Sequence, residues 1–227
     1  MSAKKQSKGV CFFCEREMTK GGMRMHLASC KERQQSIGKM KDGEHPIQNL
    51  YHLQVYDPYD ASYWLNLEMS GAARLEALDD YLRAIWLECC GHLSQFYADR
   101  RYGTEIAMAE KVYSVFRPGT EITHIYDFGS STELKITMVD QRRGKPLTSN
   151  PIFLMARNNL PEISCDECKK PAEWIDLPSL YETGEYVVLC TEHADSDSDL
   201  YEDECLPIVN SPRSGVCGYT GPAEPPY

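Results

Sequence analysis

Short hydrophobic runs separated by turn residues dominate the chain between residues 47 and 160. Aromatic and aliphatic runs of this kind, bounded by clusters such as Asp57-Pro58-Tyr59-Asp60, are typical of sheet strands. They predict strands at 51–56, 62–69, 93–97, 122–128, 132–140 and 151–156. The sequence Gly129-Ser130-Ser131 favours a hairpin turn between two of these strands.

One segment has the three- and four-residue spacing of an amphipathic helix instead. Between residues 72 and 88 its apolar positions are Leu75, Leu78, Leu82, Ile85 and Trp86, with charged residues between them. Such a stripe is buried when the helix covers a sheet. A second, weaker helix is predicted at 105–112. We therefore expect an α+β fold, an antiparallel sheet with packed helices.

Two sets of cysteine and histidine residues lie on either side of this segment, and each begins with a C-x2-C knuckle. The sets are Cys11, Cys14, His26 and Cys30 near the start, and Cys165, Cys168, Cys190 and His193 near the end. This spacing is typical of zinc sites. Four soft ligands give closed tetrahedral coordination, whereas a catalytic zinc keeps one position open. We therefore predict two structural Zn²⁺ ions in two small modules that flank the core, and no catalytic or cofactor-binding residues.

The first set lies in a short finger at residues 10–33. A helix is expected after Gly21-Gly22, so that His26 and Cys30, four residues apart, project from one face. The residues expected in its small apolar core are Phe12, Phe13, Met23 and Leu27. Because this core is so small, we expect loss of the metal to unfold the finger while the rest of the chain stays folded.

The second set resembles a zinc ribbon, because a strand-like run at 186–189 precedes its second ligand pair. Seven acids and no base lie between Glu192 and Glu204, a pattern that favours a solvated acidic loop. The Gly/Pro-rich ending is expected to be extended. It is either disordered or docked through residues 222–227 on an aromatic groove of a partner or a second copy.

The other cysteines, histidines and acids give weaker signals. Cys89-Cys90-Gly91-His92 places two thiols near an imidazole, but free cysteines are often buried and core packing is the favoured interpretation. A third, catalytic metal is not expected, since His45, His52 and His124 lack paired carboxylates at ligand spacing. We interpret four scattered acids as solvated turn residues: Asp57, Asp60, Asp127 and Glu133.

Charge divides the chain into unequal parts. The net charge is -10, yet residues 1–42 hold ten Lys and Arg against four acids, so this segment is basic and the remainder strongly acidic. A phosphate backbone would attract only the basic part, so nucleic acid is an alternative partner through residues 1–42. We expect three domains: the basic C2HC finger and linker at 1–42, the core at 43–160, and the ribbon, acidic loop and tail at 161–227.

Length and hydropathy limit the size of the core and the cellular location that we expect. A chain of 227 residues can form one substantial core with small appendages. Residues 1–8 are basic and polar, unlike a secretory signal, and no apolar run has the roughly 20 residues needed to span a bilayer. We expect a cytoplasmic protein that does not enter a membrane, in which cysteines at metal spacing are ligands rather than disulfide partners.

The central segment resembles a known family. The residues from Leu75 to Phe96, which include His92-Leu93-Ser94-Gln95-Phe96, and the later Tyr126-Asp127-Phe128-Gly129 are similar to the plasmid pRiA4b ORF-3-like family, also described as insertion-element passenger proteins of TnpR type. The resemblance covers residues 47–160, and the ribbon and the ending at 210–219 look like an extended branch of the family. It implies an α+β core and a prokaryotic, cytosolic protein, but no reaction.

The sequence therefore predicts a non-enzymatic, zinc-binding adaptor with a protein partner. The finger is suited to protein contact, to nucleic-acid contact, or simply to closing the terminus, and the ribbon to protein contact or structural support. The alternative function is a nucleic-acid-binding regulator associated with mobile elements that uses the basic finger. Neither the identity of a partner nor the oligomeric state follows from the residues.

Overall fold

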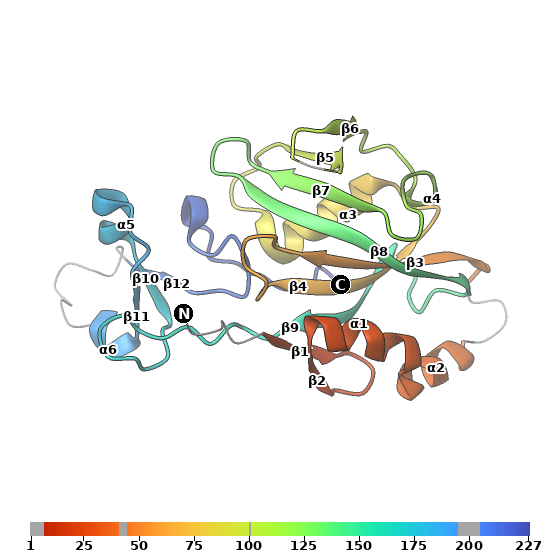
Figure 1. Ribbon diagram of the computed structural model, residues 1–227, viewed down its shortest axis with the longest axis horizontal. Coiled ribbons are helices and arrows are strands. Elements are labelled where there is room, and N and C mark those ends of the chain that lie inside the picture. The colour runs from red at the N-terminus through yellow and green to blue at the C-terminus, as the bar shows by residue number, and fades with distance from the viewer. Residues whose placement is uncertain (1–6, 41–44, 100, 195–204) are drawn as a thin grey trace.

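The computed structural model of the protein describes residues 7–40, 45–99, 101–194 and 205–227. Its largest element is an antiparallel sheet of nine strands in the order β2-β1-β9-β4-β3-β8-β7-β5-β6 (Figure 1). The strands are β1 (Lys8–Cys11), β2 (Glu17–Thr19), β3 (Gln48–Tyr56), β4 (Trp64–Ser70), β5 (Ser94–Ala98), β6 (Thr104–Ile106), β7 (Glu121–Tyr126), β8 (Thr132–Gly144) and β9 (Ile152–Asn158). All six strands predicted between residues 47 and 160 are present, as β3, β4, β5, β7, β8 and β9.

The predicted amphipathic helix is present, but it changes form along its length. It begins as α3 (Leu75–Leu82) and continues as the π-helical turn η1 (Arg83–Leu87). The five apolar residues of its stripe are fully buried against the sheet, as the spacing predicts.

The prediction of a helix at 105–112 is wrong. Strand β6 lies at the start of this segment and pairs with β5 through Phe96 and Ile106, while α4 (Val112–Val115) begins only at its end. A short isolated helix gains little by itself, whereas the hairpin satisfies backbone polar groups and adds a strand to the sheet.

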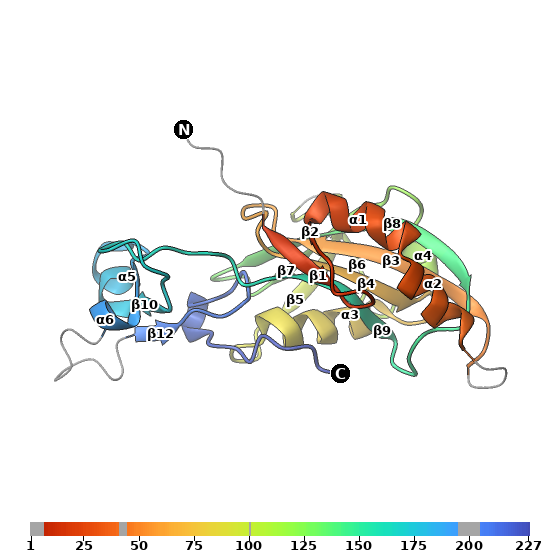
Figure 2. The ribbon, with the colours of Figure 1, turned by 90° about the horizontal axis from the view of Figure 1, so that it is seen from below.

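The two faces of the sheet carry different side chains. Leu53, Leu65 and Leu67 belong to the hydrophobic cluster that includes α3. The alternate positions His52, Asn66 and Glu68 are also buried, but they are polar and lie on the opposite face. Figure 2 shows α3 on one side of the sheet and α1 and α2 on the other, so the polar layer lies on the side of the N-terminal helices.

The N-terminal module, residues 8–38, consists of β1, β2, α1 (Lys20–Ser29) and α2 (Lys31–Gly38). Strand β1 pairs with β2 on one side and with β9 on the other, so the module extends the large sheet. Gly9 lies against the carbonyl of Arg157 and the ring of Trp64, and a Cβ atom at this position would collide with both. This close approach requires glycine.

The apolar core of the N-terminal module is shared with the large sheet. Met23 and Leu27 of α1 are buried as predicted, and they cluster with Trp64 of β4 and Met155 of β9. Phe12, which was predicted to lie in the core of the finger, is 64% exposed, although its ring packs edge-on against Phe153. The buried apolar residues of the finger are therefore covered by sheet residues that lie far from them in the sequence.

The C-terminal module, residues 164–194 and 205–208, has a separate three-stranded sheet in the order β11-β10-β12. Its elements are β10 (Trp174–Asp176), α5 (Leu177–Thr183), β11 (Val188–Leu189), α6 (Thr191–Ala194) and β12 (Cys205–Pro207). Its buried apolar side chains are few, chiefly Ile175 and Val188. Most of the predicted acidic loop, residues 195–204, lies outside the described residues.

The tail after β12 returns to the large sheet and packs on it. Ser211 donates a hydrogen bond to the carbonyl oxygen of Trp86 at 2.6 Å, and the fully buried Arg213 binds Asp127 at 2.7 Å. The ring of Tyr227 lies 5.5 Å from that of Tyr81. The prediction of an extended ending that is disordered or docks on another molecule is thus replaced by docking on its own chain.

Across the described ranges, no helix combines the length and the apolar character needed to cross a bilayer.

Candidate metal centres

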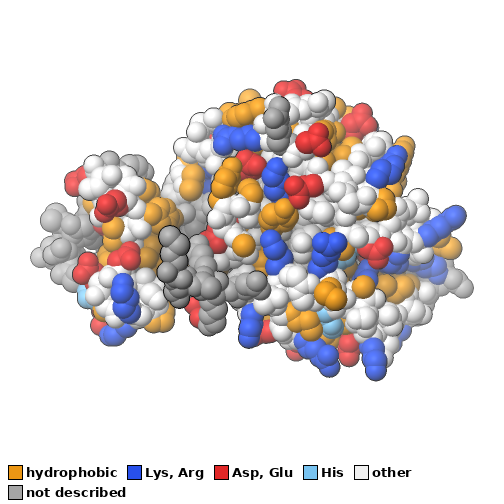
Figure 3. Space-filling view, in the orientation of Figure 1, with side chains coloured by type: hydrophobic (Ala, Val, Ile, Leu, Met, Phe, Trp, Pro, Cys, Tyr) orange, Lys and Arg blue, Asp and Glu red, His pale blue; other side chains and the backbone are white. Residues whose placement is uncertain are grey.

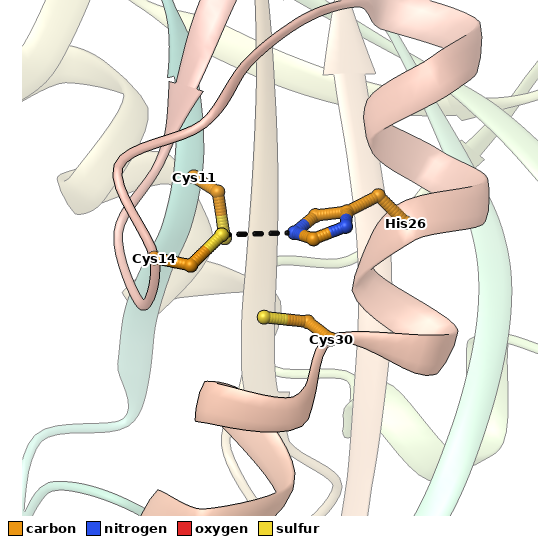
Figure 4. Close-up of side chains that lie close together, drawn as sticks. All are labelled: Cys11, Cys14, His26 and Cys30. Carbon is orange, nitrogen blue, oxygen red and sulfur yellow. Dashed lines mark hydrogen bonds between the residues drawn. The ribbon is translucent and has the colours of Figure 1, made fainter.

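The four residues of the first set converge in the structure, and we call them the N-terminal cluster. Cys11 ends β1, Cys14 lies in the turn after it, His26 projects from α1, and Cys30 follows that helix (Figure 4). Their ligand atoms all lie within 4.8 Å of one another. The Sγ of Cys14 is 3.2 Å from Nε2 of His26. One metal ion could therefore contact all four side chains.

Cys30 reaches the cluster from a position that the spacing rule does not describe. Helix α1 ends at Ser29, and Cys30 has an extended backbone between α1 and α2. The prediction that His26 and Cys30 lie on one helix face is therefore wrong in detail. The break between the two helices turns the thiol inward, where it is 2% exposed.

The C-terminal cluster consists of Cys165, Cys168, Cys190 and His193. These ligand atoms also lie within 4.8 Å of one another. The Sγ atoms of Cys168 and Cys190 are 3.6 Å apart, and Nδ1 of His193 is 3.4 Å from Sγ of Cys165. The imidazole comes from α6. Cys190 lies between β11 and this helix. This group could also hold one ion.

The two knuckles have the same backbone geometry. In the N-terminal knuckle the amide of Cys11 donates to the carbonyl oxygen of Arg16 and the amide of Glu15 donates to that of Cys11. In the C-terminal knuckle Cys165 and Lys169 make the equivalent hydrogen bonds. The residue after the second cysteine is left-handed in both, with φ of 58° at Glu15 and 64° at Lys169. Each turn is thus shaped by its own hydrogen bonds so that both thiols point to one side.

The thiols of the two clusters differ in acidity. Burial raises the pKa of Cys11, and it raises the pKa of Cys30 to about 11. Burial also acts on Cys165, but hydrogen bonds from His193 and from the backbone of Cys190 outweigh it and lower its pKa to about 6. A metal ion must therefore displace protons in the N-terminal cluster, while the C-terminal cluster offers one thiolate at neutral pH.

Two histidines and two acids outside the two predicted clusters are buried in the structure. His52 bonds to Asn66 at 2.8 Å and His124 to Asp79 at 2.6 Å, so both are buried polar contacts of the core. Asp127 and Glu133, interpreted as solvated turn acids, are only 5% and 6% exposed. A buried carboxylate needs a partner, and Asp127 finds it in Arg213 of the tail.

A third group of ligands was not predicted as a metal site: Cys89, Cys90, His92 and Cys217. Core packing was expected for Cys89 and Cys90, and only Cys89 packs partly against the core, while Cys90 is exposed. The available signal was a Cys-x-His pair after a helix. Its completing thiol lies more than a hundred residues later, a separation over which sequence spacing carries no metal signature.

A cleft of about 840 Å³ lies between the C-terminal module and the large sheet. Its lining includes Tyr63 from the sheet side and Tyr186 from the module side. Among the described residues that line it, one lysine, Lys8, contributes a positive charge, against five acids: Glu17, Asp57, Asp60, Glu162 and Asp166. Burial raises the pKa of Asp57, and the neighbouring acids Asp60 and Glu133 act in the same direction. The cleft is therefore acidic, with aromatic walls. In Figure 3 the module is the smaller lobe on the left of the larger body.

Comparison with known proteins does not assign the chain to a family. No family model matches the sequence, and no curated protein matches it significantly. One similar solved structure is the crystal structure of a protein of unknown function from Methanosarcina mazei Go1, which has 15% sequence identity and a TM-score of 0.41. The match covers 49% of this chain and 68% of that chain. The resemblance to the pRiA4b ORF-3-like family stays a prediction.

Proposed function

We propose that the chain is a non-enzymatic interaction protein in which zinc is a structural ion. The N-terminal and C-terminal clusters each supply three thiols and one imidazole, a donor set that suits Zn²⁺ and closes its tetrahedral shell. No coordination position is then left for a substrate. The ions stabilise two modules, one built into the large sheet and one with a separate sheet, and the modules present surfaces for a partner.

The partner that we infer is a protein, bound through a basic segment in the acidic cleft. Five acids against one lysine in the described lining favour a positively charged occupant and disfavour a nucleic acid at this place. Tyr186, which is 47% exposed, adds apolar area to the cleft. This lining of the cleft is the observation that carries the proposal.

Site-specific photo-crosslinking tests this function. A photoreactive residue is placed at Leu160, which lines the cleft and is 49% exposed, or at Tyr113, which is 53% exposed and lies outside the cleft lining. In the cells that produce the protein, we expect the Leu160 label to capture a defined protein through a basic segment. Equal capture by both labels, or capture of nucleic acid at Leu160, contradicts the proposal.

Charge reversal provides the matched control. Glu17 and Glu105 are exposed acids on β2 and β6, the two edge strands of the large sheet, but only Glu17 lines the cleft. Glu17→Lys should reduce the capture several-fold, while Glu105→Lys should leave it unchanged. Similar effects of both substitutions would mean that general charge, rather than the cleft, controls binding.

A second function rests on the N-terminal module. Its helices expose Arg24 and Lys31, and Lys39 follows them, which gives a basic surface for a phosphate backbone. Figure 3 shows Lys and Arg side chains along the lower right of the molecule, the side of α1 and α2. This surface favours the alternative of a nucleic-acid-binding regulator.

A salt titration with a labelled DNA duplex separates the two functions. If the alternative holds, affinity falls steeply with salt, and the triple change of Arg24, Lys31 and Lys39 to Gln weakens binding at least tenfold. Lys169→Gln, on the C-terminal module, is the control and should have no effect. Binding that is insensitive to the triple change rejects the module as a nucleic-acid surface.

A further inference from the structure

The third cluster brings four ligand atoms close enough together to hold one metal ion. Its four ligand atoms, one each from Cys89, Cys90, His92 and Cys217, lie within 4.8 Å of one another. Sγ of Cys90 is 3.6 Å from Sγ of Cys89 and 3.7 Å from Sγ of Cys217. A tetrahedral zinc with bonds of about 2.3 Å to sulfur places its thiolates about 3.8 Å apart. The thiols therefore lie at the separation that one zinc ion requires.

The imidazole completes the same shell. Nε2 of His92 lies 3.5 Å from Sγ of Cys217 and 2.9 Å from Sγ of Cys90. These values are similar to the 3.2 Å and 3.4 Å between His and Cys in the N-terminal and C-terminal clusters. The donor set is again three thiols and one imidazole, although no C-x2-C knuckle is present.

Backbone strain at Cys217 is an independent observation at this site. Cys217 has φ of 53°, between Gly215 at 78° and Gly218 at 68°. A non-glycine residue in the left-handed region costs about 1 kcal/mol or more, and such strain is concentrated at functional positions. Glycine would fit this turn at lower cost. The strained backbone places the thiol beside Cys90 and His92. A ligand role for Cys217 therefore explains why a cysteine stands at a position that favours glycine.

Charge at the cluster also suits a bound cation. When Zn²⁺ binds, the three thiols release three protons to solvent, and three thiolates with a neutral imidazole leave a net charge of about -1. The guanidinium of Arg213 is 3.5 Å from Sγ of Cys89 and is itself fully buried. The same guanidinium pairs with Asp127 at 2.7 Å, so its positive charge is shared between that carboxylate and the Cys89 thiolate.

We propose that Cys89, Cys90, His92 and Cys217 bind a third zinc ion, which fastens the tail to the end of η1. The ligands come from two segments that are far apart in the sequence, so the ion acts as a cross-link between the tail and the core. Cys90 and Cys217 are exposed, in contrast to the buried Cys11 and Cys165 of the flanking clusters. The tail would thus be held by the most accessible ion in the protein.

Metal content of single variants tests this site. Elemental analysis of the full chain, purified with Zn²⁺, should give three ions for the unaltered protein and two for Cys217→Ser. The matched control is Cys205→Ser, in the same C-terminal segment but outside all three clusters, which should retain three. Cys90→Ser provides a second variant, because Cys90 is exposed and its replacement leaves no cavity.

Two results overturn the proposal. One is equal zinc content in Cys217→Ser and Cys205→Ser. The other is a disulfide between Cys90 and Cys217 in the isolated chain, detected by mass spectrometry after thiol alkylation, with zinc content unaffected by its reduction.

Hydrogen exchange provides a readout of the cross-link. Amides of Gly215, Val216 and Tyr219 are hydrogen-bonded within the turn that carries Cys217. With zinc present throughout, their exchange should be at least tenfold faster in Cys217→Ser than in Cys205→Ser, because the other two clusters keep their ions in both variants. Equal exchange rates in the two variants would contradict the assignment.

Discussion

The N-terminal and C-terminal modules have the same knuckle and the same ligand types, but they are anchored in different ways. In the N-terminal module β1 pairs with β9, and its apolar residues cluster with Trp64 and Met155 of the large sheet. The C-terminal module has a sheet of its own and buries few apolar side chains, chiefly Ile175 and Val188. One module is therefore built into the large sheet and packs on the face opposite α3, while the other adjoins the sheet.

The polar layer under the N-terminal helices strengthens this difference. Glu68, only 4% exposed, accepts hydrogen bonds from Arg33 of α2 at 3.1 Å and from Arg142 of β8 at 2.6 Å. A buried carboxylate with two guanidinium partners is costly to disrupt, because removal of one group leaves the others unpaired. Similar metal chemistry can therefore have global or local consequences, depending on what the module packs against.

The largest expected effect separates the two modules directly. Cys14→Ser and Cys168→Ser replace the second cysteine of each knuckle. Cys14→Ser should lower the free energy of unfolding of the whole chain by about 3 kcal/mol or more, because the zinc-bound module pairs with β9 and packs on Trp64 and Met155 of the large sheet. This differs from the expectation from sequence that only the finger would unfold.

Cys168→Ser should change the main transition by less than about 1 kcal/mol, because the C-terminal module has a separate sheet. Its effect should instead be rapid hydrogen exchange within residues 164–194. Denaturant melts, together with metal content, measure both variants. Equal destabilisation of the main transition would remove the proposed difference between the modules.

A smaller effect is expected at the junction of β1 and β9. Gly9→Ala should lower the free energy of unfolding by about 2 kcal/mol, because the added Cβ collides with the carbonyl of Arg157 and the ring of Trp64. Gly38→Ala is the control, since nothing lies within 4 Å of a Cβ there and alanine favours the helix. Thermal melts of both variants provide the comparison. An unchanged stability of Gly9→Ala would show that the junction of β1 and β9 shifts to accept the added Cβ.

The smallest expected effect is a loss of folding stability at acidic pH. Burial lowers the pKa of His52 to about 4, below its usual value near 6.5. The unfolded chain therefore binds the extra proton in this interval, and stability falls as pH falls from about 6.5 toward 4. Between pH 7 and 5 the expected loss is about 1 to 2 kcal/mol.

His52→Gln should remove this part of the pH dependence, as measured by denaturant melts at the two pH values. Acid also weakens metal binding, and the difference between the two proteins cancels that contribution. Identical pH dependence in both proteins would mean that His52 is not the group responsible.

Local features of the chain could be predicted because they depend on neighbouring residues. The strands at β3, β4, β7 and β8 follow from short apolar runs between turns, and α3 follows from its three- and four-residue spacing. The two predicted ligand sets are also local, since each knuckle is shaped by hydrogen bonds across a few residues. The helix predicted at 105–112 failed because pairing with β5 outweighs a weak local preference.

The sequence by itself determined the six strands predicted in the central segment, the amphipathic helix at α3, and which thiols belong to the two knuckles. Only the tertiary structure decided where those elements lie: β1 on β9, Arg213 on Asp127, and Cys217 beside Cys90. Each of these contacts joins residues more than 80 positions apart. Many such pairings compete, and their outcome depends on burial and charge across the whole fold rather than on any local period.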